Sequence, residues 1–263
     1  MKLPQHFRIT LTGTIEEFRS REVVQEGFSH PFANILCGAD IPPDLFRAWG
    51  LTIAVEENIE DGLKDTEMCN LYRLKTGTEE MAALFNARVT KPVEWKPEIY
   101  PRYVAPVVIE HEGDRRIGPM NWGFPTQVKG KTKTLIKNVT NARNIESPFW
   151  KGAASNPARR CLVPFTQFAE PRPGKDAEGL PAQWWFTIND QLIPCFAGLW
   201  RPTESGPAFA FLTTDPNPLV EPLHPKAMPV VLHSDDHERW LRGSFEDVLA
   251  LQAPYPSQMM AVK

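Results

Sequence analysis

The chain has 263 residues, of which 42% are hydrophobic, and its formal net charge is −3. This length and apolar content predict a globular protein with one large domain or two small ones. No apolar run approaches the roughly 18 residues that span a bilayer, and the N-terminal residues lack the apolar core of a signal peptide. We therefore expect a cytoplasmic protein that does not engage a membrane.

The cysteines indicate neither a zinc site nor a disulfide framework, because no two of them form a C-x-x-C pair. Two of the four lie in apolar runs and are expected in the core. His233 and His237 have the i, i+4 spacing of metal ligands, but two aspartates between them predict an exposed helix start instead. We expect no metal and no cofactor. The four cysteines are Cys37, Cys69, Cys161 and Cys195, of which the last two are the expected core residues.

Charge is distributed unevenly along the chain. Residues 1–67 contain six Lys/Arg and twelve Asp/Glu, a balance of −6, whereas the remainder has 23 basic and 20 acidic residues, a balance of +3. Between residues 129 and 160, eight basic residues accompany a single acidic one. Such a cluster is either a solvated face or a groove for a polyanion such as nucleic acid. Its basic members are Lys129, Lys131, Lys133, Lys137, Arg143, Lys151, Arg159 and Arg160.

Residues 1–67 carry little patterning. Short stretches at 8–12 and 53–55 are weak strand candidates, and the acidic residues of 56–67 are typical of an exposed linker. We expect an N-terminal extension over 1–67, either a leader or sequence ahead of the functional start, followed by one domain over 68–263.

From residue 76 onward the periodicity becomes clearer. Thr78 is expected to cap a helix with Met81, Leu84 and Phe85 on one face. Many short strands with few helices predict an α+β fold, a single compact domain around an antiparallel, barrel-like β-sheet with flanking helices. The other predicted elements are strands at 103–109, 160–165, 209–214 and 228–232, a turn at 112–114, a hairpin of 183–188 with 191–200 that turns at 189–190, a loop at 171–181, and helices at 148–154 and 234–242.

Cys69 follows Met68 directly. If translation begins at Met68 and that methionine is removed, Cys69 carries an amine and a thiol on adjacent carbons. The alternative is a half-buried free cysteine near a strand. While residues 1–67 remain attached, Cys69 has no free α-amine.

Several ordered stretches resemble the SRAP family (SOS response-associated peptidase), whose members crosslink to abasic sites in single-stranded DNA. The resemblance covers residues 68 to about 245. No single motif is decisive, but the ordered set is specific. The stretches are Met-Cys-Asn-Leu-Tyr at 68–72, Trp-Gly-Phe-Pro at 122–125, Asn-Ala-Arg at 141–143, Arg-Arg-Cys-Leu-Val-Pro at 159–164, Phe-Ala-Glu at 168–170, Phe-Ala-Gly-Leu-Trp at 196–200 and Leu-His-Pro-Lys-Ala-Met-Pro at 223–229.

The resemblance implies a thiazolidine crosslink through Cys69. An abasic site exposes an aldehyde, and a 1,2-aminothiol condenses with an aldehyde to a five-membered ring. An α-amine with a pKa of about 7.7–8.0 is neutral some hundreds-fold more often at pH 7 than a lysine near 10.4. Once the imine forms, the tethered thiol attacks at a high effective concentration.

The resemblance also implies roles for three further catalytic residues. Glu170 would shuttle protons during dehydration of the carbinolamine. His224 would protonate the sugar ring oxygen as the abasic site opens, and Asn141 would hydrogen-bond the sugar or the amine. Taken alone, Glu170 is also consistent with a surface glutamate at a strand end, and His224 with an ordinary loop histidine.

The implied DNA contacts come from different parts of the chain. Arg143 would hold a phosphate, and Lys133 belongs to the basic cluster. Trp122 would either stack on a base or fill the core. Ala227 stands where relatives often carry an arginine, and Lys226 is the candidate for that missing charge.

Two other functions remain open. A cysteine peptidase would use Cys69 as nucleophile and His224 or Glu170 as base, acting on residues 1–68 of its own chain. A non-catalytic protein would bind single-stranded DNA through the basic groove alone. The favoured hypothesis is a monomeric DNA-repair enzyme of the bacterial cytoplasm, nucleoid-associated when bound to single-stranded DNA with abasic sites.

Overall fold

The computed structural model describes residues 7–8, 56–57, 70–129 and 134–263. The chain divides into two units, residues 1–63 and 64–263. In the first unit, β1 (Phe7–Arg8) pairs antiparallel with β2 (Glu56–Glu57). Apart from Arg8, the strand candidates at 8–12 and 53–55 lie outside the described residues.

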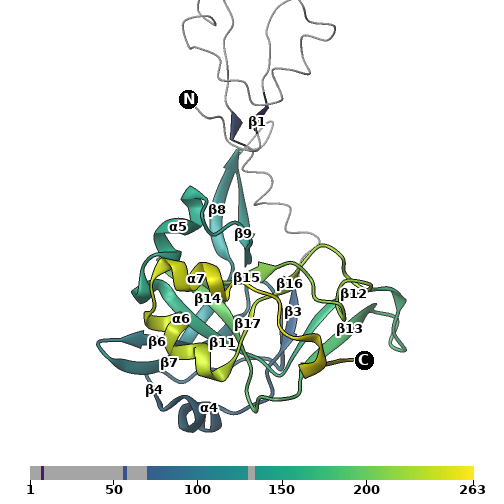
Figure 1. The fold of residues 1–263 in the computed structure, drawn as a ribbon, viewed down its shortest axis with the longest axis horizontal. Coiled ribbons are helices and arrows are strands. Elements are labelled where there is room, and N and C mark those ends of the chain that lie inside the picture. The colour runs from purple at the N-terminus through teal and green to yellow at the C-terminus, as the bar shows by residue number, and fades with distance from the viewer. Residues whose placement is uncertain (1–6, 9–55, 58–69, 130–133) are drawn as a thin grey trace, which may run out of the picture. The chain divides into compact units, whose positions relative to one another are not determined.

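A closed barrel of five strands forms the centre of the second unit (Figure 1). The order is β15-β14-β11-β6-β7, and β7 pairs back onto β15. Neighbouring strands run antiparallel except at this closing pair, which is parallel and places Trp122 opposite Phe209. The predicted α+β class and antiparallel, barrel-like sheet are thus confirmed. The five strands are β6 (Val104–His111), β7 (Asp114–Trp122), β11 (Arg160–Pro164), β14 (Cys195–Thr203) and β15 (Gly206–Thr214).

Short strands extend the barrel. Two of them run parallel to a barrel strand, β4 to β7 and β10 to β15, while β16 and β17 pair antiparallel with β15 and β14. The antiparallel pair β8 and β9 forms a separate two-stranded sheet. Their bounds are β4 (Ala87–Val89), β8 (Phe124–Lys129), β9 (Thr134–Val139), β10 (Asn141–Ala142), β16 (Met228–Pro229) and β17 (Val231–Leu232).

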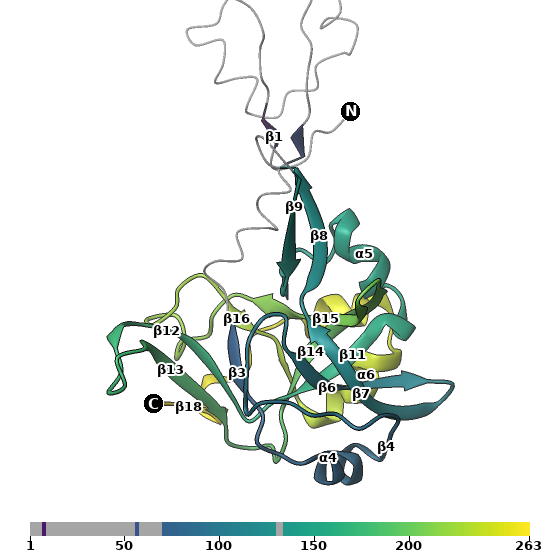
Figure 2. The same cartoon turned by 180° about the vertical axis from the view of Figure 1, so that it is seen from behind.

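A second, antiparallel sheet has the order β18-β13-β12-β3-β5 and lies beside the barrel (Figure 2). Tyr72 of β3 joins this sheet to the barrel, because its ring packs edge-on against the rings of Trp122 and Phe196. The ring centroids are 5.2 Å and 5.7 Å apart, respectively. The shared core therefore holds β3 against the barrel wall. The strands are β3 (Leu71–Arg73), β5 (Glu98–Ile99), β12 (Gln167–Lys175), β13 (Pro181–Ile188) and β18 (Met260–Val262).

Four helices flank these sheets in the described part of the chain. The helix expected at 148–154 is confirmed, with Pro148 at its first position after Ser147. The last helix was not predicted, although Ser244 and Asp247 form a capping box at its start. No described helix is long and apolar enough to cross a bilayer. The helices are α4 (Thr78–Phe85), α5 (Pro148–Ala154), α6 (His237–Arg242) and α7 (Phe245–Leu251).

The predicted hairpin over 183–200 is wrong. β13 pairs with β12 and β18, whereas β14 belongs to the barrel. Residues 189–190 do not form a two-residue turn, because both bind the C-terminal segment. The Asn189 N–H donates to the Met259 carbonyl at 2.8 Å, and the Tyr255 hydroxyl donates to Asp190 at 2.8 Å.

Three further expectations need smaller corrections. β12 continues to Lys175 through the predicted loop, so that only residues 176–180 connect it to β13. Leu84 is exposed, unlike its helix neighbours Met81 and Phe85. The helix expected at 234–242 begins only at His237, because a 3-10 turn at Ser234–Asp236 precedes α6.

Candidate active site

Glu170 and His224, which were both expected at the catalytic site, lie next to each other. Nδ1 of His224 is 3.6 Å from Oε2 of Glu170. Glu170 is on β12 and is 0% exposed, and His224 lies in the connection from β15 to β16 and is 8% exposed. Two chain segments distant in sequence thus place a carboxyl and an imidazole in one nearly dry position.

Burial controls the protonation of Glu170. Within the described residues, neither of its carboxyl oxygens has a hydrogen-bond partner. This loss of hydration raises the pKa of the Glu170 carboxyl well above its ordinary value, because the charged form is disfavoured away from water. A neutral carboxylic acid is a proton donor. Because Glu170 is fully buried, the alternative of a surface glutamate is wrong.

The hydrogen bond of His224 sets its tautomer. Nδ1 lies 2.8 Å from the carbonyl oxygen of Ala227. A carbonyl oxygen only accepts, so Nδ1 carries the hydrogen and Nε2 is the acceptor in the neutral ring. Nε2 is then the atom through which His224 can exchange a proton with a ligand.

Asn141 lies on β10, next to the same barrel strand that leads to His224. It is buried, and its Nδ2 donates to Oγ1 of Thr140 at 2.9 Å. In the parallel β10–β15 pair Asn141 stands opposite Phe211, whose ring lies 6.4 Å from that of Tyr72. The strand partner of Asn141, Phe211, therefore contacts β3 through the ring of Tyr72.

The proposed nucleophile Cys69 lies outside the described residues. The strand that follows it begins at Leu71, which pairs with Ala169, the residue before Glu170. The structure thus places the start of β3 beside Glu170.

The expected DNA contacts have different surroundings. Arg143 is half-exposed, and its Nη2 donates to the carboxylate of Asp215. Lys226 is exposed, and Lys133 lies outside the described residues.

Trp122 is a core residue, so its assignment as a DNA contact needs correction. It is 0% exposed, its indole N–H donates to the Thr140 carbonyl at 3.1 Å, and its ring stacks on Phe211 at 5.2 Å. A ring covered in this way has no free face for a base. Of the two interpretations drawn from the sequence, filling the core is the one that the structure supports.

The basic cluster is not one continuous surface. Arg160 is 1% exposed and donates to the carbonyls of Ala154, Trp240 and Gly243, at the ends of α5 and α6. This guanidinium satisfies helix C-termini and cannot reach a polyanion. Lys137 and Lys151, by contrast, are exposed.

The expected exposure of His237 is also wrong. Burial, reinforced by Arg115, lowers the pKa of His237 to about 4. His233 is half-buried and packs on Tyr255 with ring centroids 4.5 Å apart. No group of three or more His, Cys, Asp or Glu residues within the described chain is arranged to hold a metal ion.

Two residues next to Glu170, Trp184 and Arg172, were not predicted from the sequence. Trp184 is directly opposite Glu170 in the β12–β13 pair, and the Arg172 guanidinium lies 4.5 Å from the centroid of its ring. The only signals in the sequence were the Glu-Pro-Arg-Pro stretch after Glu170 and the Trp-Trp pair of β13.

Comparisons with known proteins agree on the extent of the domain. The sequence model of the family described as SOS response associated peptidase (SRAP) matches residues 68–263. A search among curated proteins gave no match.

Solved structures show the same fold at low sequence identity. A protein from Bordetella bronchiseptica is 22% identical with a TM-score of 0.58, covering 74% of this chain and 98% of its own. A protein from Bacteroides thetaiotaomicron is 20% identical with a TM-score of 0.58, covering 74% and 90%. A phage-related protein from Bordetella bronchiseptica is 18% identical with a TM-score of 0.56, covering 74% and 93%.

Proposed function

The chain belongs to the SOS response associated peptidase (SRAP) family, and from this membership we propose that it captures abasic sites in single-stranded DNA as a covalent thiazolidine on an N-terminal Cys69. One observation carries the proposal. A buried Glu170, whose pKa is raised by burial, contacts His224 beside the strand that starts two residues after Cys69. Because two residues of chain span at most about 7 Å, connectivity keeps Cys69 close to Leu71, which pairs with the neighbour of Glu170.

The proposed reaction joins the two groups of Cys69 to the aldehyde carbon of the opened sugar. The neutral α-amine attacks this carbon and forms a carbinolamine. Glu170 protonates the carbinolamine hydroxyl, which leaves as water, and the C–N bond becomes an iminium. The thiol then attacks the same carbon and returns its proton to Glu170. One C–N and one C–S bond form, and one water is released.

His224 acts one step earlier in this scheme. The closed sugar of an abasic site opens when its ring oxygen gains a proton. In the imidazolium form Nδ1–H remains on the Ala227 carbonyl, so Nε2–H is the donor that faces the sugar. Asn141 orients the sugar or the amine, and Arg143 exchanges Asp215 for a DNA phosphate.

The protonation of Glu170 also distinguishes the alternatives. A peptidase, the activity in the family's name, needs a base to activate Cys69, and a neutral carboxyl is a poor base, which leaves His224 for that role. A buried carboxyl that makes no hydrogen bond among the described residues lowers the stability of the folded protein. A protein that only binds DNA would not need such a group. An acid that dehydrates a carbinolamine accounts for this carboxyl.

The test uses a chain that begins at Met68, from which the cell removes the methionine. Incubated with single-stranded DNA that carries one abasic site, it should give a band that survives denaturation, with a mass equal to the sum of both partners minus one water. Cys69→Ala should abolish this band. Cys161→Ala is the matched control, because Cys161 is a fully buried core residue, and its crosslink should persist. An undiminished crosslink in Cys69→Ala would refute the nucleophile.

The peptidase alternative has its own readout. A peptide spanning residues 60–75, offered in trans, should remain uncut if crosslinking is the activity of this site. Cleavage after Met68 that depends on His224 would favour the peptidase. The 263-residue chain, with residues 1–67 still attached, should form no thiazolidine because Cys69 then has no α-amine.

A further inference from the structure

We propose that Arg172 and Trp184 form a binding site for the phosphate backbone of single-stranded DNA next to Glu170. The proposal rests on the proposed function, since it concerns the strand that carries the abasic nucleotide. Neither residue was expected from the sequence, and neither belongs to the basic cluster at 129–160.

The strand register places this pair on the face of Glu170. Directly opposite residues of an antiparallel pair share a face, so the side chain of Trp184 lies on the same side as that of Glu170. The register shifts after Pro171, but the position of Arg172 is fixed by its contact, with Cζ 4.5 Å from the centroid of the Trp184 ring. A buried acid and an exposed cation therefore stand side by side.

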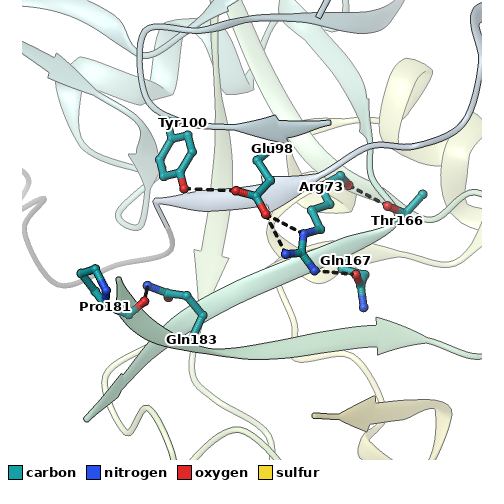
Figure 3. A network of polar contacts seen from close by, with 7 residues as sticks. All are labelled: Arg73, Glu98, Tyr100, Thr166, Gln167, Pro181 and Gln183. Atoms are coloured by element: carbon teal, nitrogen blue, oxygen red, sulfur yellow. Dashed lines mark hydrogen bonds and ion pairs between the residues drawn. The ribbon is translucent and has the colours of Figure 1, made fainter. Parts of the chain in front are cut away.

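The opposite face of β13 carries a second arginine–tryptophan pair, Arg73 and Trp185, in which the arginine has an acidic partner. The Arg73 guanidinium lies 3.5 Å from the centroid of the Trp185 ring. It donates to Glu98 at 2.6 Å and 3.0 Å and to Gln167 at 3.3 Å (Figure 3). Its charge is neutralised within the protein, and the pair serves to join β5, β3 and β12.

Arg172 lacks such a partner in the described part of the chain. No ion pair or side-chain hydrogen bond involves its guanidinium there, and residues 171–181 are all exposed. Asp176, the exposed acidic residue nearest to Arg172 in sequence, is used in the β12–β13 turn, where it accepts from the N–H groups of Glu178 and Leu180. A positive charge is thus held at the edge of the site with its donors available.

Local sequence holds this cation in place before any ligand binds. Pro171 and Pro173 flank Arg172, and a residue that precedes proline is restricted to extended conformations. Stacking on the Trp184 indole further limits the guanidinium while leaving its edge free for a phosphate. Less conformational freedom is then lost on binding, which favours affinity.

The position fits a backbone phosphate of the same strand that places its sugar at Glu170. Cross-strand neighbours stand about 5 Å apart, and an arginine side chain extends beyond that distance. A phosphate flanking the captured sugar therefore falls within reach of Arg172. Because burial raises the pKa of the Glu170 carboxyl and disfavours its charged form, the repulsion between this carboxyl and that phosphate is reduced.

The first experiment needs no crosslinking chemistry. The full chain is titrated against a fluorescein-labelled oligothymidine without abasic sites, and anisotropy gives Kd from low to moderate NaCl. Arg172→Gln should weaken binding about tenfold, and the slope of log K against log salt should become shallower by about 0.7, the value for one phosphate contact on a single strand. Trp184→Ala should weaken binding similarly, while Trp184→Phe should retain most of it.

Lys75→Gln is the matched control. Lys75 is exposed, lies beyond the other end of β3 and loses the same charge when changed. It should alter Kd less than twofold. Equal effects of Arg172→Gln and Lys75→Gln would overturn the inference, because then only net charge matters. Arg172 is exposed, so circular dichroism of the variant should match that of the wild type.

A second experiment separates this inference from the proposed function. With the chain that begins at Met68 and abasic DNA, Arg172→Gln should raise the half-saturating DNA concentration about tenfold and leave the maximal crosslinking rate unchanged. Suppose that the wild type does not crosslink, but that Arg172→Gln raises the Kd for DNA without abasic sites tenfold. This outcome would refute the proposed function and support the binding site. A wild type that crosslinks, with the same half-saturation in the Arg172 and Lys75 variants, would refute only the binding site.

Discussion

Glu170 shows how one residue trades stability for reactivity. The Glu170 carboxyl is enclosed by protein and makes no hydrogen bond among the described residues. It therefore lowers the free energy of unfolding at every pH at which the same carboxyl is ionised in the unfolded chain. The same enclosure raises the pKa of the Glu170 carboxyl, which favours the form that can donate a proton. The site is therefore expected to be a point of local instability that chemistry requires.

The change Glu170→Gln separates these two effects. Because the pKa of Glu170 is raised in the folded state, its favourable contribution is complete below the unfolded pKa of about 4.3 and is lost as the pH rises. The neutral amide avoids that loss. The variant should have a higher Tm than the wild type at pH 7.5, with a difference that shrinks toward pH 4.5, while its crosslinking rate falls by about 100-fold or more.

Exposed Glu178→Gln provides the comparison for this measurement, since a solvated carboxyl should leave Tm unchanged at both pH values. A lower Tm for Glu170→Gln at pH 7.5 would mean that the ionised carboxylate is stabilised in the folded protein. The assignment of Glu170 as an acid would then be wrong.

At the scale of elements, Arg160 joins two helices to the barrel. One guanidinium on β11 binds the Ala154 carbonyl at the end of α5 and the Trp240 and Gly243 carbonyls at the end of α6. Burial lowers the pKa of Arg160, but the carbonyls still favour the cation's position at these helix C-termini.

Replacing Arg160 by Ala should therefore destabilise the fold by about 2–4 kcal/mol, because three carbonyls at helix ends lose a charged donor. Chemical denaturation of the variant and the wild type measures this difference. The adjacent Arg159 stacks on Trp200 and is only half-buried, so Arg159→Ala should cost less than about 1 kcal/mol. Similar losses for both variants would contradict the role assigned to Arg160.

Local signals in the sequence predicted those elements whose partners are close along the chain. Ser147-Pro148 marked the start of α5, and the turn between β6 and β7 has positive φ angles at Glu112 and Gly113, of 55° and 82°. Residues 189–190 look like another turn, but their hydrogen bonds reach the C-terminal segment. Pairing over such a distance leaves no local pattern.

The candidate site was predictable to a similar degree. Resemblance named Glu170 and His224, and the structure adds their 3.6 Å contact. The resemblance could not show that Trp122 is enclosed, because a tryptophan in a Gly/Pro-rich stretch is consistent with both a core position and a surface position. The Arg172–Trp184 stack depends on cross-strand register, which composition does not encode.

At the scale of the whole molecule, residues 64–263 form a unit with its own core. The similar solved structures align to 74% of this chain while using 90–98% of their own length, so the shared fold does not require the whole chain. A unit with its own core is expected to unfold as one cooperative transition.

Removing residues 1–63 should accordingly leave the Tm of this transition within about 2 °C of the full chain, where 1 kcal/mol corresponds to about 2–4 °C at this size. Scanning calorimetry of both chains measures it. A decrease of more than about 5 °C would show that the first unit stabilises the second.

The parallel pair that closes the barrel also determines when the site can exist during synthesis. β15 supplies the closing residues, and His224 comes still later in the chain. At about 5–20 residues per second, the ribosome needs roughly 7–28 s to proceed from Cys69 to Phe209. A nascent chain that begins at Met68 would therefore carry the amine and the thiol of Cys69 at its N-terminus for that interval. They would be exposed to small cellular aldehydes before Glu170 and His224 have come together.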